Sequence, residues 1–302
     1  MSAGVFTHRR SMPSRPGGLL SSRAAILVLL PIVMAGVASA WWLSSAPGEI
    51  RLTDGGLRVA ASFLSRALSP ALEYESQVPA GTTPLVLKAL GAAEATVRFA
   101  AAAMSLALVG GVVLGFLSSS AWWFGDPVRA RSMPARLARS VGPLIYGMSR
   151  ILIAVMRSIH ELFWAVLLLA AFGVTPLAAV LAIAIPYSGI LAKVFSELVD
   201  EAPRESAIAL RESGASSLQM FLFGLLPRAL PDMAAYAFYR FECALRSSAI
   251  LGFFGFPTLG YYIAASFENL LYGEVWTYLY VLCGLIVLMD WWSGALRRRY
   301  VA

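Results

Sequence analysis

Three charged residues stand in an otherwise apolar part of the chain, where they have the greatest potential for chemistry. Arg240, Glu242 and Arg246 follow Pro231 in a stretch that is apolar enough to enter a membrane. A charged side chain at the centre of a membrane-spanning helix costs about 2.5–3.5 kcal/mol, so these groups are expected to face protein or water. Glu242 and Arg246 are four residues apart and can pair on one helical face. The trio predicts either a buried ion-pair network or a positively charged lining for an anion pathway.

The other candidate for acid–base chemistry is the neighbouring pair His160 and Glu161. Neighbours on a helix point in different directions, so a polar start to a helix is favoured over a catalytic pair. The sequence has no GxxxxGK(S/T) loop for nucleotide phosphates, no HExxH and no GxSxG motif. Cys243 and Cys283 lie in apolar runs without CxxC spacing. We therefore predict no catalytic, cofactor or metal site.

The composition places these residues in a membrane protein. Of 302 residues, 59% are hydrophobic and only 14% are charged, which is too apolar for an ordinary soluble domain. The net charge of +7 comes almost wholly from arginine, because Lys88 and Lys193 are the two lysines. Since the arginines cluster beside apolar runs, anionic lipid headgroups are favoured over nucleic acid as their partner.

Uncharged runs predict an all-α polytopic membrane protein with about six transmembrane helices. A helix needs about 20 apolar residues to cross the hydrocarbon core. The uncharged run 162–192 would measure roughly 46 Å as one helix, and GVTP at 173–176 is a break signal that divides it into two spans. The predicted spans are residues 24–43, about 96–118, two within 162–192, one from Pro231 and one over 275–294.

The arginines also predict the orientation of the chain. Clusters before the first span, between the second and third, and after the sixth fall on one side, which the positive-inside rule makes cytoplasmic, with both termini. The predicted parts are a basic tail at 1–23, an anchor at 24–43, a periplasmic segment with a short amphipathic helix at 44–95, a core at 96–295 and a basic end at 296–302.

Two further patterns predict how helices pack. GVVLG at 111–115 is a GxxxG motif, whose small residues favour close packing within the chain over a special dimer contact. LIYGMSRILIAVMRSI at 144–159 has the apolar spacing of a helix, with Arg150 and Arg157 seven residues apart. It predicts a helix along the lipid headgroups, in preference to a solvated loop.

The segment 205–231 reads ESAIALRESGASSLQMFLFGLLPRALP and lies between apolar runs. Its first part favours a helix, which Gly214 is expected to end because glycine adopts the left-handed conformation without strain. A second short helix then carries large apolar side chains, and Pro227 and Pro231 begin the next span. This predicts a cytoplasmic helix–turn–helix that either fits a groove on a partner or is a connector without one.

The same segment resembles the cytoplasmic coupling loop of ABC-transporter permeases, whose pattern is EAA, three residues, Gly, nine residues, Ile, one residue and Leu-Pro. Ile208 stands in place of the glutamate and Gly224 in place of the isoleucine. Glu205, one helical turn earlier, is a candidate for the missing acid. The matching positions are taken by Ala209, Gly214, Leu226 and Pro227.

Longer stretches resemble the permeases of phosphonate transporters. RSIHELFWAV at 157–166 is similar to their RSIPELVWA, and LRESGASSLQMFLFGLLPRALP at 210–231 is similar to their LRATGAS…LP segment. YRFECALRSSAILG at 239–252 is similar to their YRFE…VRSA…LG motif, whereas the following FFGFPTLG departs from their VGAGGIG. The likeness covers roughly residues 50–300.

The resemblance implies the ABC-importer type I permease fold in the bacterial inner membrane. It implies a pore subunit that has no ATPase site or cofactor of its own and carries a phosphonate or a related phosphorus oxyanion. The implied partners are a separate ATP-binding subunit, a periplasmic substrate-binding protein and a second permease protomer, identical or related. ATPase coupling is expected in a loop at about 198–230 and at Glu205, Ala209, Gly214, Leu218, Phe221 and Pro227.

Three alternatives stand beside this interpretation. The chain could be a permease of the same superfamily for another small solute, such as an amino acid. It could also be a polytopic membrane enzyme, or an assembly scaffold without transport. An ATPase subunit that is retained on purification distinguishes a permease from an enzyme.

Overall fold

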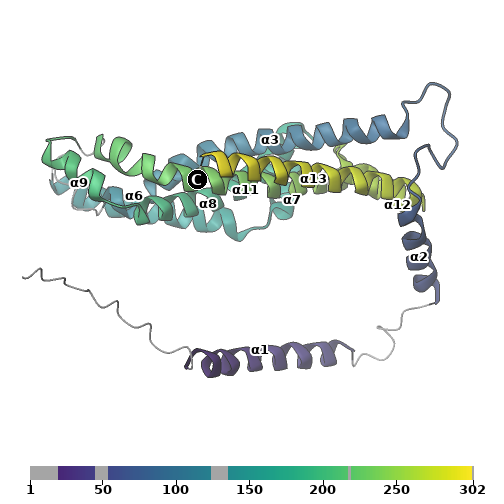
Figure 1. Cartoon of the computed structure of the whole chain (residues 1–302), viewed down its shortest axis with the longest axis horizontal. Coiled ribbons are helices and arrows are strands. Elements are labelled where there is room, and N and C mark those ends of the chain that lie inside the picture. The colour runs from purple at the N-terminus through teal and green to yellow at the C-terminus, as the bar shows by residue number, and fades with distance from the viewer. Residues whose placement is uncertain (1–19, 45–53, 124–134, 217–218, 301–302) are drawn as a thin grey trace, which may run out of the picture. The chain divides into compact units, whose positions relative to one another are not determined.

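A computed structural model describes residues 20–44, 54–123, 135–216 and 219–300 (Figure 1). The predicted tail before residue 20, the arginines at 129 and 131, Leu218 and the last two residues lie outside this description. The chain divides into two units, residues 1–61 and 62–302. The first unit contains α1 (Leu20–Ser44), which covers the residues of the predicted anchor, and most of α2 (Asp54–Ser65), which lies in the segment where an amphipathic helix was predicted.

Every regular element that is described in the second unit is helical, as predicted. Figure 1 shows α3, α8, α11 and α13 running along one direction, with α9 at one end and α12 towards the other. The elements are η1 (Arg66–Leu68), α3 (Leu85–Leu117), α4 (Ser120–Trp123), α6 (Ala135–Ser158), α7 (Glu161–Phe172), α8 (Pro176–Glu201), α9 (Glu205–Glu212), η2 (Met220–Leu225), α11 (Leu226–Ile250), η3 (Leu251–Phe254), α12 (Leu259–Glu268) and α13 (Tyr272–Tyr300).

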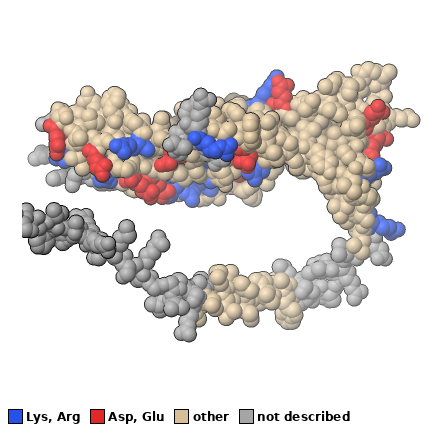
Figure 2. Space-filling model, in the orientation of Figure 1, with Lys and Arg blue, Asp and Glu red and all other residues tan. Residues whose placement is uncertain are grey.

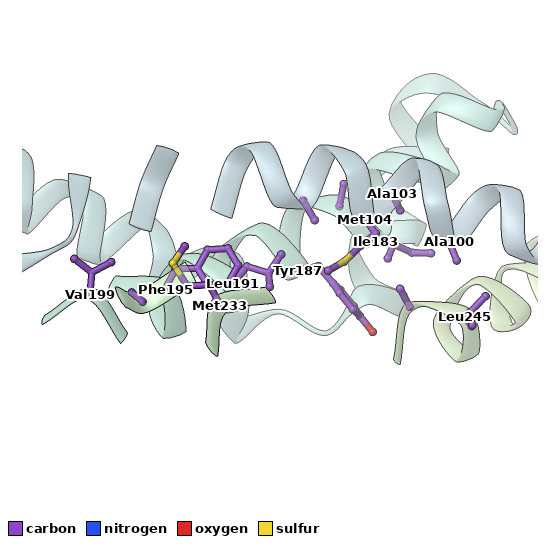
Figure 3. Close-up of a cluster of buried hydrophobic side chains, with 14 of the residues drawn as sticks. Ala100, Ala103, Met104, Ile183, Tyr187, Leu191, Phe195, Val199, Met233 and Leu245 are labelled. Atoms are coloured by element: carbon purple, nitrogen blue, oxygen red, sulfur yellow. The ribbon is translucent and has the colours of Figure 1, made fainter. Parts of the chain in front are cut away.

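Helix α8 is the central element of this unit. It packs most extensively against α3, and also against α6, α7 and α11. Many of the buried residues between these helices are alanines, which allow the backbones to approach closely. The core drawn in Figure 3 includes Ala100, Ala103 and Met104 of α3, Ile183, Tyr187, Leu191 and Phe195 of α8, and Met233 and Leu245 of α11.

The GxxxG motif packs within the chain, as predicted. A Cβ atom on Gly111 would lie 2.6 Å from Cβ of Leu191, and one on Gly115 would lie 3.1 Å from Cβ of Phe195. Helix α8 approaches α6 at a similarly short distance on its other side, because a Cβ on Gly189 would lie 2.8 Å from Cβ of Met156. Small residues therefore fix α8 against α3 and α6 at short distance.

Three described helices are long and apolar enough to cross a membrane: α3, α8 and α13 up to Leu296. The number rises to five if each of two bent pairs is one span. One pair is α6 with α7, bent by 92°, and the other is the run Met220–Phe254 with α12, bent by 47°. The first unit adds a shorter apolar helix, Leu29–Trp42, and the described helices thus supply three to five candidate spans against the predicted six.

The start of α3 differs from the prediction. The helix begins at Leu85 and not near residue 96, although Lys88, Glu94 and Arg98 lie in its first turns. These charges are accommodated at the surface: Arg98 pairs with Glu94 at 2.6 Å, and the Lys88 ammonium lies 4.7 Å from the ring centroid of Tyr262. The predicted segment 44–95 therefore ends in the first part of a long helix.

Two other helix boundaries also differ. The predicted break after Phe172 is present, where Gly173 has φ +72°. However, α7 has 12 residues, or roughly 18 Å, which is too short to cross alone. The fifth span does not begin at Pro231, because the helical run that contains it extends over Met220–Phe254 and Pro231 lies inside α11.

Helix α6 confirms the predicted helical spacing around residue 150. Ser149 and Ile153 are buried, while the apolar side chains on its other side are exposed. The buried side packs against α8. The location of α6 along the lipid headgroups stays a prediction. The exposed apolar residues are Leu144, Met148, Ile151, Leu152 and Val155.

Candidate functional site

The chain after α8 forms a helical hairpin, defined here as residues 205–228. Its first arm is α9, and Gly214 ends the turn after it with φ +87°, as predicted. The Gly214 N–H donates to the Arg211 carbonyl at 2.9 Å, and the Ala215 N–H donates to the Leu210 carbonyl at 3.0 Å. These two bonds satisfy the last carbonyls of the helix and reverse the chain. A residue with a Cβ would be strained at this φ.

A capping box begins the second arm. The Gln219 N–H donates to Ser216 Oγ at 3.4 Å, and the Ser216 N–H donates to Gln219 Oε1 at 2.8 Å. The arm continues as η2, a π-helical segment that runs directly into α11. Short π-helical segments are rare and often occur at functional sites. The second arm is therefore continuous with one of the candidate membrane spans.

The two arms approach each other at backbone distance. A Cβ on Gly224 of η2 would lie 3.0 Å from Cα and 3.1 Å from the nitrogen of Ala207, which is fully buried on α9. Below this contact, Arg228 Nη2 donates to Ser206 Oγ at 3.1 Å. The glycine at position 224, which departs from the coupling-loop pattern, is explained by this close approach.

The hairpin is anchored to the bundle through its second arm. Phe221 is 4% exposed, and its ring meets the edge of Phe116 of α3 with 4.9 Å between centroids. An apolar groove of about 360 Å³ lies beside this contact and is lined by residues of α3, α8, η2 and α11. Met220 and Leu225 are also buried. Phe221 therefore holds the hairpin in place and does not belong to its exposed face.

The exposed face of the hairpin combines charged and apolar side chains. Ile208 of α9 is 45% exposed and Phe223 of η2 is 70% exposed, although neither was a predicted site residue. Figure 2 shows acidic and basic side chains close together at the end that carries α9. Leu218 lies outside the described residues. Of the other predicted coupling residues, Phe221 is buried, and those exposed are Glu205, Ala209, Gly214 and Pro227.

The three charged residues of α11 do not form one network. Arg246 Nη2 donates to Glu242 Oε1 at 2.7 Å, which confirms the predicted pair; the two side chains are 52% and 15% exposed. Arg240 instead donates from Nε to the Tyr236 hydroxyl at 2.8 Å. Its guanidinium carbon also lies 5.6 Å from the ring centroid of Tyr239. Among the described residues the trio therefore makes two separate polar contacts, and its role as a pathway lining or an ion-pair network stays a prediction.

A further polar cluster in this region was not predicted. Ser247 Oγ donates to Glu161 Oε1 at 2.9 Å and lies 3.1 Å from the Tyr187 hydroxyl, so that α7, α8 and α11 meet there. Ser247 follows Arg240 by seven residues and thus shares its helical face, but its distant partners leave no local sequence signal. His160 Nδ1 accepts from the Leu162 N–H at 3.3 Å, which is the predicted polar helix start.

Across the described ranges, no group of three or more His, Cys, Asp and Glu side chains could hold a metal ion. Cys243 and Cys283 are both free thiols.

Comparison with known proteins finds permeases of transport systems among the relatives of this chain. The chain is 35% identical to the phosphite transport system permease protein PtxC of Stutzerimonas stutzeri over 161 residues, or 52% of this chain and 58% of that protein. It is 31% identical to the phosphate-import permease protein PhnE of Mycolicibacterium smegmatis over 176 residues, or 57% of this chain and 33% of that protein. The matches thus span less than two thirds of these relatives.

Solved structures share the fold at lower sequence identity. The methionine ABC transporter MetNI in an inward-facing conformation has a chain with a TM-score of 0.57 and 18% identity, covering 72% of this chain and 99% of that one. An amino acid ABC transporter gives a TM-score of 0.56 at 16% identity, covering 70% and 94%. The fold is therefore that of ABC-importer permeases, as predicted.

A family model spans most of the second unit. It is described as the binding-protein-dependent transport system inner membrane component, and it matches residues 132–301, which include the whole hairpin and all of α11. This match covers more than half of the chain and confirms the predicted permease family. The chain belongs to the binding-protein-dependent transport system inner membrane component family.

Proposed function

We propose that this chain is the pore subunit of an ABC importer that carries phosphite, phosphonate or a related phosphorus oxyanion. The substrate class is supported by relatives that are named phosphite, phosphonate and phosphate permeases. Arg240 and the Arg246–Glu242 pair would contribute a net positive charge to the pathway. The main alternative is an amino acid, which the shared fold with a methionine transporter permits.

The observation that carries the proposal is the construction of the hairpin. Backbone contact between Gly224 and Ala207 makes the two arms one stiff body, and Phe221 fixes that body to the bundle. Its exposed face offers Ile208 and Phe223 as apolar anchors with charged residues around them, a composition that suits a protein interface. A separate ATP-binding subunit would dock there, and the chain would hydrolyse no ATP itself.

The remaining parts of the proposed assembly follow from the same role. Two permease protomers, identical or related, would enclose the pathway, and a substrate-binding protein would deliver the anion at the opposite face. With the hairpin in the cytoplasm, the positive-inside rule would put both termini on the cytoplasmic side of the inner membrane. Movement of the docked ATPase would then act on α8 and α11, the two helices that the hairpin joins.

Co-purification with the cognate ATP-binding subunit tests this role. We expect the wild-type chain to retain that subunit and Gly214→Val to lose it, because valine at φ +87° costs at least about 1–2 kcal/mol and opens the turn. Gly81→Val is the matched control, since Gly81 has φ +93° in a loop before α3, and it should retain the subunit.

Two outcomes would count against the proposal. If the wild-type chain does not retain the ATP-binding subunit, or if Gly214→Val retains it as well as Gly81→Val does, the hairpin is not the docking site. An enzymatic activity of the chain alone that ignores both substitutions would favour a membrane enzyme. Uptake of phosphite, compared with uptake of methionine by the same complex in proteoliposomes, decides between the two solute classes.

A further inference from the structure

A carboxylate beside the hairpin joins three parts of the bundle. Asp200 is the penultimate residue of α8, and its side chain is 18% exposed. It accepts three hydrogen bonds: from Ser119 Oγ at 2.7 Å, from the Ser120 N–H at 3.0 Å and from the Ala121 N–H at 2.8 Å. Both carboxylate oxygens are therefore engaged by the turn that follows α3.

A third element reaches the same carboxylate. Arg150 of α6 places Nη2 4.0 Å from Asp200 Oδ2, and its guanidinium carbon lies 5.2 Å from the ring centroid of Tyr146. The neighbouring Ser149 donates from Oγ to the Leu117 carbonyl at 3.2 Å. Asp200 thus connects α8 with the end of α3 and with α6 at a single point.

The position of Asp200 relates this junction to the hairpin. Only residues 202–204 separate the end of α8 from the start of α9, and Ala202 is buried. A displacement of the first arm would therefore reach α8 within one turn of Asp200. Through the carboxylate it would reach α3 and α6, neither of which is joined to the hairpin by the chain.

We propose that Asp200 is a positioning residue that passes movement of the hairpin to α3 and α6. This inference rests on the proposed function, because it requires the hairpin to be moved by an ATP-binding subunit. The carboxylate suits the role since charge-assisted hydrogen bonds are short and about twice as strong as neutral ones. An asparagine in its place has one acceptor oxygen instead of two and turns an amide N–H₂ towards a backbone donor.

The test uses the complete transporter in proteoliposomes, with phosphite as the transported solute. ATP hydrolysis and phosphite uptake are measured together, and their ratio reports coupling. We expect Asp200→Asn to assemble and hydrolyse ATP while the phosphite moved per ATP falls by about tenfold, an ordinary coupling between two sites. Glu201→Gln makes the same chemical change on the exposed neighbouring residue and should leave the ratio unchanged.

The outcomes separate the two proposals. An unchanged ratio in Asp200→Asn, or a parallel fall of uptake and hydrolysis, overturns the role of Asp200 while the transporter itself stands. If Asp200→Asn fails to assemble, Ser119→Ala removes one of the three bonds and should still lower the ratio; an unchanged ratio there also overturns it. If the wild-type complex hydrolyses ATP without moving phosphite, the proposed substrate is wrong and the inference falls with it.

Discussion

The contact between Gly224 and Ala207 gives a prediction whose sign can be worked out from the structure. Gly224→Ala adds one methyl group at 3.0 Å from Cα, 3.1 Å from the nitrogen and 3.2 Å from Cβ of Ala207. Ordinary carbon contacts are about 3.5–4.0 Å, so α9 would have to move by several tenths of an ångström. Two of the three opposing atoms belong to the backbone, so a change of side-chain rotamer cannot relieve the contact.

Two effects of opposite sign decide the outcome. Replacing a helical glycine by alanine usually stabilises by about 0.5–1 kcal/mol, because glycine loses more freedom on folding. Overpacking a close contact usually destabilises by about 1–3 kcal/mol. Since the opposing Cα and nitrogen of Ala207 cannot move without the α9 backbone, we expect the overpacking effect to be the larger one. The expected net loss of folding free energy is about 1–2 kcal/mol.

Thermal unfolding of the purified chain in a mild detergent measures this effect. Gly91→Ala is the control, because a Cβ on this glycine of α3 meets nothing within 4 Å. We expect the unfolding midpoint to fall for Gly224→Ala and to stay or rise for Gly91→Ala. A rise for both variants would refute the argument that backbone contact between the arms requires glycine.

A second variant locates the contact more sharply. Ala207→Gly in the Gly224→Ala background removes one opposing atom, the Cβ of Ala207, but leaves its Cα and nitrogen in place. The double variant should therefore recover only part of the lost stability. Complete recovery would show that the side chain of Ala207, and not the α9 backbone, sets the distance between the arms.

Two further predictions concern the polar groups of α11. Arg246→Ala should change folding stability by less than about 1 kcal/mol, because the Arg246 side chain is half-exposed. Lost phosphite uptake with normal assembly supports a pathway role, whereas lost assembly excludes it. Tyr187→Phe should lower the folding stability by about 1–2 kcal/mol, because the hydroxyl contact with buried Ser247 is lost. The unfolding midpoint measures this effect. An unchanged midpoint would show that this contact does not hold α8 to α11.

Local signals in the sequence predicted the features that depend on local conformation. Gly214 ends α9 in the left-handed region, and the break after Phe172 lies at the predicted GVTP. The GxxxG motif was assigned to packing within the chain, and Gly111 indeed lies against Leu191. In each case a glycine or proline imposes its conformation or spacing through its own geometry, so the neighbouring sequence is sufficient.

The orientation of the second arm could not be predicted from apolar spacing. The sequence presents a row of large apolar residues, for which a second short helix was predicted. In the structure η2 is π-helical, with hydrogen bonds to the fifth residue, so the sides that successive residues face differ from those of an α-helix. Phe221 is buried in the core and Phe223 is exposed, although the two have the same side chain, and apolar spacing alone does not tell which of them faces inward.

Contacts between distant residues also left no signal. Asp200 and Ser119 are 81 residues apart, and Ser247 and Glu161 are 86 apart. In its local sequence, each of these side chains is an ordinary polar residue near a helix end or in a span, with nothing that indicates its distant partner. Only the packing of α3, α6, α7 and α11 around α8 brings them together.

The exposure of α11 bears on what surrounds the chain in the membrane. Arg246 is 52% exposed in the second unit, although it lies within a candidate membrane span. A charged group that faced lipid there would cost about 2.5–3.5 kcal/mol, and a pair whose arginine is half-exposed offsets little of this. The face of α11 with Arg246 is therefore expected to meet protein or water. A second protomer that encloses an aqueous pathway along α11 supplies both, which is the arrangement that the proposed importer requires.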